Sequence, residues 1–162
     1  MTQVADGMRT AIRLAEMPAI VPVLTAGGVG LAVWEGFSRI VAPLWLGFAL
    51  DPTGLIEMSI GLTGMAATLL HIFTGLVIFP AAYLLLVQPI VARLAPGMPW
   101  IAVALGYGVA LWVFAMYGMA SLLGGMPPFL GFGPIAWASL IGHLGLAVGI
   151  AATAAAWRGA RA

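Results

Sequence analysis

Four strongly polar ionisable side chains lie inside long apolar runs of this 162-residue sequence: Glu35, Arg39, His71 and His143. Burying a charged group in apolar surroundings is costly unless the group is paired or hydrogen-bonded. Ionisable side chains retained in membrane-spanning segments therefore pair with one another or serve a functional site. These four residues are the candidates for the chemistry of this protein.

The first two of these residues share the segment WEGFSRI, residues 34–40. Glu35 precedes Arg39 by four positions, the order that favours an ion pair within one helix. The spacing predicts an intramembrane ion pair that faces a helix interface. The alternatives are a counter-charge for a cofactor, part of a proton path, or a salt bridge to a partner subunit.

The two histidines stand in the segments LLHIFTG and IGHLG, each close to glycine. Two imidazoles from two helices, with glycine nearby to make room for a flat ring, can hold a b-type haem. His71 and His143 are therefore candidate cofactor-binding residues, for haem b, with quinone binding or proton transfer as alternatives. The competing interpretation is that each histidine hydrogen-bonds across a helix interface and fixes packing.

Depth in the membrane links these four residues. At a rise of 1.5 Å per residue from the flanking loops, Arg39, His71 and His143 lie about 18, 21 and 15 Å from one membrane surface. Glu35 lies one turn deeper than Arg39. We therefore predict one polar level near mid-membrane, with Glu35 and Arg39 facing protein rather than lipid.

Other kinds of site find less support. Met116, Met119 and Met126 could offer thioether ligands to copper(I), but they form no tight repeated array, so apolar packing is favoured. The sequence has no cysteine, which excludes disulfides, thiolate nucleophiles and c-type haem attachment. It has no HExxH motif and no phosphate-binding glycine motif, so hydrolysis and phosphoryl transfer are not expected. No metal is expected beyond a haem iron.

The composition requires a membrane protein to position these residues. The chain is 63% hydrophobic and 7% charged, and a soluble domain with so few charges would expose large apolar patches. It has six arginines and no lysine, so no nucleic-acid partner is expected. The fold class is all-α: an integral membrane four-helix up-down bundle. A short interfacial helix over residues 1–18 is predicted to precede the bundle.

Four apolar segments are long enough to span a bilayer, within a single transmembrane domain over 1–162. They run over about 20–50, 58–90, 100–123 and 134–157. The first two exceed the required length, so they must tilt or bend, and Pro43, Pro80 and Pro89 are the expected places. Short connections between the segments favour the up-down order.

Arginine placement predicts the orientation. The arginines outside the spans precede the first span, follow the second and follow the fourth, while the other two loops carry none. The positive-inside rule then predicts both termini in the cytoplasm of a bacterial inner membrane. Trp45, Trp100, Trp137 and Trp157 lie toward segment ends, as interfacial anchors do.

Small residues recur at helical spacing in several spans and predict close helix packing. Gly28, Ala32 and Gly36 form one such seam, and Ala102, Gly106 and Ala110 form another. A third seam includes Gly142, Gly145 and Gly149. The number of small faces, together with the uncharged loop GGMPPFLGFGP, favours association with other membrane subunits.

Three strings, HIFTGLVIFPAAY, GYGVALWVFAMYGM and WASLIGHLG, are similar to those of small four-span bacterial inner-membrane proteins of uncharacterised function. In size and span number the chain also resembles accessory subunits of respiratory complexes of the haem–copper oxidase type. The resemblance implies a helical subunit attached to an electron-transport enzyme. We therefore predict a non-catalytic accessory subunit of a larger bacterial membrane complex, and we expect bound lipid and no cofactor. The alternative is a haem- or quinone-binding redox protein, and the third is a small transporter with Glu35 and Arg39 lining the path.

Overall fold

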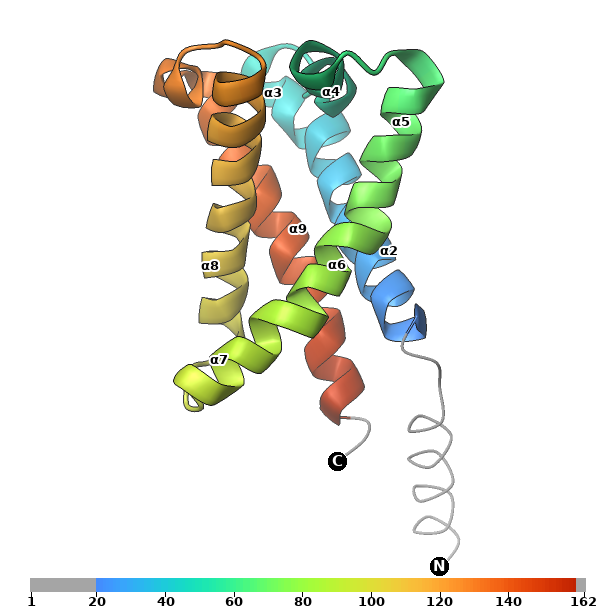
Figure 1. The fold of residues 1–162 in the computed structure, drawn as a ribbon, viewed down its shortest axis with the longest axis vertical. Helices are drawn as coiled ribbons and strands as arrows, with labels where there is room; N and C mark the ends of the chain where they lie inside the picture. The colour runs from blue at the N-terminus through green and yellow to red at the C-terminus, as the bar shows by residue number, and fades with distance from the viewer. Residues whose placement is uncertain (1–19, 160–162) are drawn as a thin grey trace, which may run out of the picture.

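The computed structural model describes residues 20–159 and is helical throughout its regular structure. Four helical spans are long and apolar enough to cross a membrane: Ile20–Leu46, Gly64–Leu94, Trp100–Leu123 and Pro134–Gly159. They alternate in direction along the bundle (Figure 1). The predicted all-α membrane bundle is therefore confirmed. The predicted interfacial helix over residues 1–18 lies outside the described residues.

The first two spans change helical type along their length. The first consists of α2 (Ile20–Gly36), the π-helical segment η1 (Phe37–Val41) and α3 (Ala42–Leu46). The second consists of α5 (Gly64–Phe73), η2 (Thr74–Ile78), α6 (Phe79–Ala82), η3 (Tyr83–Val87) and α7 (Gln88–Leu94), of which η2 and η3 are π-helical.

A π-helical segment directly precedes the short helix that contains each of Pro43, Pro80 and Pro89. Proline has no backbone N–H, and its ring clashes with the carbonyl four residues earlier. A wider π-helical turn relieves that clash without breaking the helix. The expected proline positions are thus where these long spans depart from α-helical geometry.

The boundaries of the first two spans differ from the prediction. The first span ends at Leu46 rather than near 50, because Gly47 adopts a left-handed conformation (φ +81°). The second begins at Gly64 rather than near 58, because Gly61 (φ +74°) ends a separate helix, α4 (Pro52–Ile60). Hydropathy continues across Gly61, so the apolar run alone did not reveal the break.

The third and fourth spans follow their predicted ranges closely. The third consists of α8 (Trp100–Val113) and the π-helical η4 (Phe114–Leu123), and the fourth is α9 (Pro134–Gly159). Between them the short helix η5 (Pro128–Phe132) includes three non-glycine residues with positive φ: Phe129, Leu130 and Phe132. The ring of Phe129 lies 4.8 Å from that of Trp112, so the uncharged loop packs onto the bundle.

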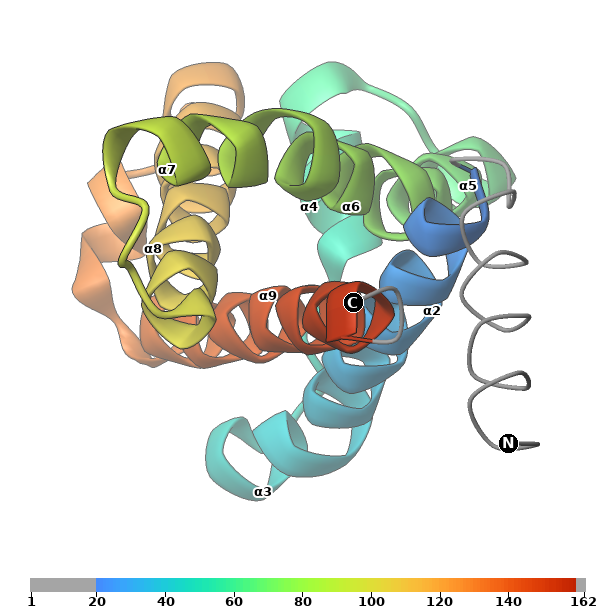
Figure 2. The same ribbon diagram turned by 90° about the horizontal axis from the view of Figure 1, so that it is seen from below.

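Helix α9 lies between α2 and α8, and glycine permits both contacts (Figures 1 and 2). A Cβ at Gly149 would lie 3.1 Å from the Cα of Gly30 on α2, and a Cβ at Gly108 on α8 would lie 2.9 Å from the Cα of Leu144. The second span packs on the other side of α2, where a Cβ at Gly27 would overlap the carbonyl oxygen of Leu76. These contacts are possible only where side chains are absent.

The predicted seams divide into inner and outer ones. Gly142, Gly145 and Gly149 pack against Trp34, Val33 and Gly30 of α2, respectively. In contrast, a Cβ at Gly28, Gly36 or Gly106 would meet nothing within 4 Å, and Ala32 is exposed. Within the described chain, the inner seam of α2 therefore runs through Gly27 and Gly30 rather than through Gly28, Ala32 and Gly36.

Candidate functional site

A cavity of about 790 Å³ lies at the end of the bundle that carries α4, which we term the α4 end. Figure 1 shows the second span and α8 diverging toward this end. They meet near mid-span, where the Tyr107 hydroxyl donates a 2.7 Å hydrogen bond to the carbonyl oxygen of Phe79. The volume of the cavity falls within the roughly 300–1,000 Å³ range of small-molecule sites.

The lining of this cavity is mainly apolar with a few polar groups. Methionine, leucine, isoleucine and phenylalanine side chains of the second, third and fourth spans, of α4 and of the adjoining loops contribute most of the apolar surface, and the first span contributes Trp34. The polar or aromatic N–H-bearing members are Trp34, Asp51, His71, Thr74, Ser139 and His143. A small number of polar groups in an apolar cavity is typical of a site that orients an apolar ligand.

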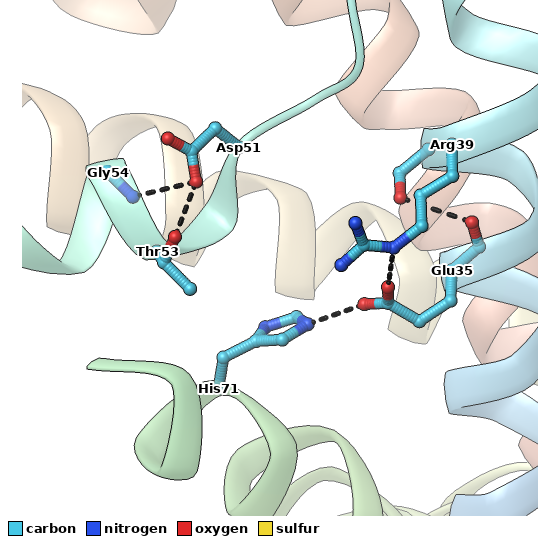
Figure 3. A network of polar contacts seen from close by, with 7 residues as sticks. Glu35, Arg39, Asp51, Thr53, Gly54 and His71 are labelled. Atoms are coloured by element: carbon cyan, nitrogen blue, oxygen red, sulfur yellow. Dashed lines mark hydrogen bonds and ion pairs between the residues drawn. The ribbon is translucent and has the colours of Figure 1, made fainter. Parts of the chain in front are cut away.

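Helix α4 lies across the α4 end of the bundle and borders the cavity. Asp51 caps this helix: its Oδ1 accepts hydrogen bonds from the Thr53 hydroxyl at 2.6 Å and from the Gly54 N–H at 2.9 Å (Figure 3). The hydroxyl of Ser59 lies within hydrogen-bond distance of two carbonyl oxygens, that of Leu55 in α4 at 2.7 Å and that of Met119 in η4 at 3.0 Å, and donation to the second joins α4 to η4. The cavity therefore has a cover held by hydrogen bonds.

The cap gives α4 a pH dependence. The hydrogen bonds from Thr53 and then from Gly54 hold the pKa of Asp51 below its ordinary value. A depressed folded pKa stabilises the helix above the unfolded pKa, and that contribution is lost as the pH falls through the folded value. We expect faster amide hydrogen exchange in α4 below about pH 4, corrected for intrinsic rates, and no such extra pH dependence in Asp51→Ala. Equal behaviour of the two proteins would contradict the cap.

The Glu35 carboxylate joins Arg39 and His71 in one network (Figure 3). Arg39 Nε lies 2.5 Å from Glu35 Oε2, and His71 Nε2 lies 2.9 Å from Glu35 Oε1. The side chains of His71 and Glu35 are 16% and 29% exposed, whereas that of Arg39 is 70% exposed. The carboxylate thus bridges the cavity side of α5 and the outer surface of the bundle.

In this arrangement the four residues that were predicted to form one polar level do not all face the same way. Glu35 faces protein through His71, and His71 and His143 line the same cavity. Arg39 instead lies on the surface of the described chain, so of the two protein surroundings that the prediction allows, the bundle interior and a neighbouring subunit, it does not face the first. It lies two turns from the end of its span at Leu46, so its long side chain can extend toward the membrane surface.

His143 is 6% exposed and has a free ring nitrogen. Its Nδ1 lies 2.7 Å from the carbonyl oxygen of Ser139 and 3.3 Å from the Ser139 hydroxyl. With a proton on Nδ1 the ring donates to the carbonyl, and with none it accepts from the hydroxyl. Among the described residues no partner engages Nε2, so this nitrogen can accept in the first tautomer and donate in the second.

The sequence interpretation missed Trp34, which lies beside His143. Their ring centroids are 4.7 Å apart, Trp34 is 6% exposed, and its indole N–H has no hydrogen-bond partner among the described residues. The other mid-span tryptophan, Trp112, donates to the carbonyl oxygen of Ala136 at 2.9 Å. A tryptophan far from the span ends was the available signal, because a buried indole N–H needs an acceptor.

The contacts fit the predicted haem site poorly. His71 Nε2 is engaged by Glu35, so axial ligation through that nitrogen would require the contact with the carboxylate to break. The glycines beside the two histidines serve helix packing: Gly75 faces Leu31, Gly142 faces Trp34 and Gly145 faces Val33. Glycine near each histidine therefore does not provide the room for a macrocycle that the sequence pattern had suggested.

Two further observations limit the chemistry of the site. The described residues contain no group of three or more histidine, aspartate or glutamate side chains that could hold a metal ion. Met116, Met119 and Met126 line the cavity, where their flexible side chains supply apolar surface.

No protein-family model, curated protein sequence or solved structure matches the chain.

Proposed function

We propose that this protein binds a quinone in the cavity, as part of electron transport in a bacterial inner membrane. One observation carries the proposal: the rings of Trp34 and His143 lie 4.7 Å apart, centroid to centroid, in the lining of a mainly apolar cavity, and the indole N–H of the first and the Nε2 of the second have no partner among the described residues. A quinone has two ring oxygens and a long apolar tail. It therefore needs a few hydrogen-bonding groups within apolar surroundings.

The two residues suit both redox forms of such a ring. The Trp34 N–H can donate to either a quinone carbonyl or a hydroquinone hydroxyl. His143 can accept from a hydroxyl when Nδ1 carries the proton, and can donate to a carbonyl in the tautomer supported by the Ser139 hydroxyl. His71, held by Glu35, adds an ionisable group to the same cavity wall.

A second candidate function is an accessory role beside another membrane subunit. The specific observation is a face of α2 that no other described residue covers, formed by Gly28, Ala32 and Gly36, with the 70% exposed side chain of Arg39 in the same span. Small residues allow another helix to approach closely. Both roles can belong to one subunit, because Gly28, Ala32 and Gly36 do not line the cavity.

Purification of the full chain in mild detergent tests both candidates. We expect solvent extraction and chromatography to recover quinone, and saturating reconstitution to approach one quinone per chain. The same preparation is expected to show no haem Soret band. Lack of saturable quinone binding by folded protein would overturn the first proposal, and a Soret band lost in His143→Leu would replace quinone with haem. A stable chain without copurifying proteins would count against the accessory role.

A further inference from the structure

A second pocket, of about 440 Å³, lies at the opposite end of the bundle. It is formed by α7, the first turn of α8 and the end of α9, which surround this end in Figure 2. Tyr83 lines this pocket and Phe79 lines the larger cavity, and both contact Tyr107 between them. The pocket is therefore distinct from the proposed quinone site.

The polar groups of this pocket favour an anion. Arg158 lines it and forms no ion pair with another described residue. Gln88 also lines it, and its side-chain nitrogen is buried without a hydrogen-bond partner among the described residues. None of the residues that line the pocket is acidic. A cation and an unused N–H donor together suit phosphate oxygens.

The surroundings of these groups indicate where the anion comes from. Arg158 lies in the last turn of its membrane span and Trp100 is the first residue of another, so the pocket lies at the level of the membrane interface. Apart from the hydroxyl of Tyr83, which lies beside Gln88, the rest of the lining is mainly apolar and includes Val91, Met98 and Val103. Such a pocket accommodates a phosphate group with its adjoining glycerol and acyl carbons better than a free, fully hydrated ion.

We propose that this pocket binds the phosphate headgroup of an anionic phospholipid in the leaflet at the α7 end of the bundle. The Arg158 guanidinium pairs with the phosphate, and the Gln88 amide donates a hydrogen bond to a phosphate oxygen. Basic pockets between spans are a known way to hold anionic headgroups. The proposal is independent of the quinone site.

Lipid binding to the purified, delipidated full chain tests this proposal. The measurement is native mass spectrometry in detergent with phosphatidylglycerol or phosphatidylcholine of the same acyl chains. We expect wild-type protein to prefer phosphatidylglycerol by about tenfold, and Arg158→Gln to lose most of that preference. The matched control is Arg93→Gln, which removes the same charge from the end of α7 but not from the pocket lining. Its preference is expected to stay within about twofold of wild type.

Two other outcomes would overturn the proposed lipid site. Equal losses in Arg158→Gln and Arg93→Gln would show general surface attraction and overturn the site. Competition by millimolar inorganic phosphate, with no preference between the two lipids, would replace the lipid with free phosphate. Arg158→Lys, which keeps the charge, and Gln88→Leu serve if Arg158→Gln does not fold. Arg158→Lys is expected to retain most of the preference for phosphatidylglycerol, and Gln88→Leu is expected to reduce that preference about threefold.

Discussion

Replacing His143 with leucine is expected to lower the quinone affinity of the purified protein by at least about tenfold. Leucine has a similar size, so the wall of the cavity is retained while the free Nε2 is lost. The bond from Nδ1 to Ser139 lies within one helix, so its removal breaks no hydrogen bond between helices. The measurement is a titration of the protein with quinone in detergent, monitored by isothermal titration calorimetry.

Two tryptophan variants extend this result: Trp34→Phe is a second test of the cavity, and Trp112→Phe is its matched control. Trp34→Phe removes the unpartnered indole N–H from the cavity, and a loss of about fivefold or more is expected. Trp112→Phe removes an indole N–H that is bonded to Ala136 and that does not line the cavity, so its quinone affinity should equal that of wild type. Unchanged affinity in folded His143→Leu and Trp34→Phe would place the quinone elsewhere or exclude it.

Replacing Gly27 with alanine is expected to destabilise the bundle by about 2 kcal/mol or more. The added Cβ would overlap the carbonyl oxygen of Leu76, a backbone atom that cannot rotate away. The second span would therefore have to move off α2. The next residue offers an internal control, because a Cβ at Gly28 meets nothing within 4 Å. Gly28→Ala should be neutral or stabilising by up to about 1 kcal/mol, since alanine favours helix.

Unfolding of the purified variants in a mixed-micelle denaturant series measures this difference. Equal stabilities of Gly27→Ala and Gly28→Ala would show that the second span does not pack on α2 as described. The same position tests the accessory role when a bulky residue is used. Gly28→Leu should leave the isolated chain stable but release a copurifying membrane subunit, because it would block close approach to the uncovered face of α2.

Part of the candidate site could be predicted from local spacing. Glu35 and Arg39 are one helical turn apart, so any helix over this segment brings them within reach. Equal depth also predicted that His71 and His143 lie near each other, and both line the same cavity. Depth does not specify direction around a helix, and it therefore could not show that His71 contacts Glu35 while Arg39 lies on the outer surface.

The sequence by itself determined the all-α membrane fold, the number of spans and the ends of the third and fourth, because apolar length and helix-breaking residues act locally. Only the tertiary structure decided that Gly27 and Gly30, rather than Gly28 and Gly36, lie against neighbouring helices. These spans carry small and apolar residues around their whole circumference, so hydropathy does not distinguish an inner face. The cavity and the unpartnered Trp34 arise from the divergence of the second span from α8, which depends on how whole helices pack.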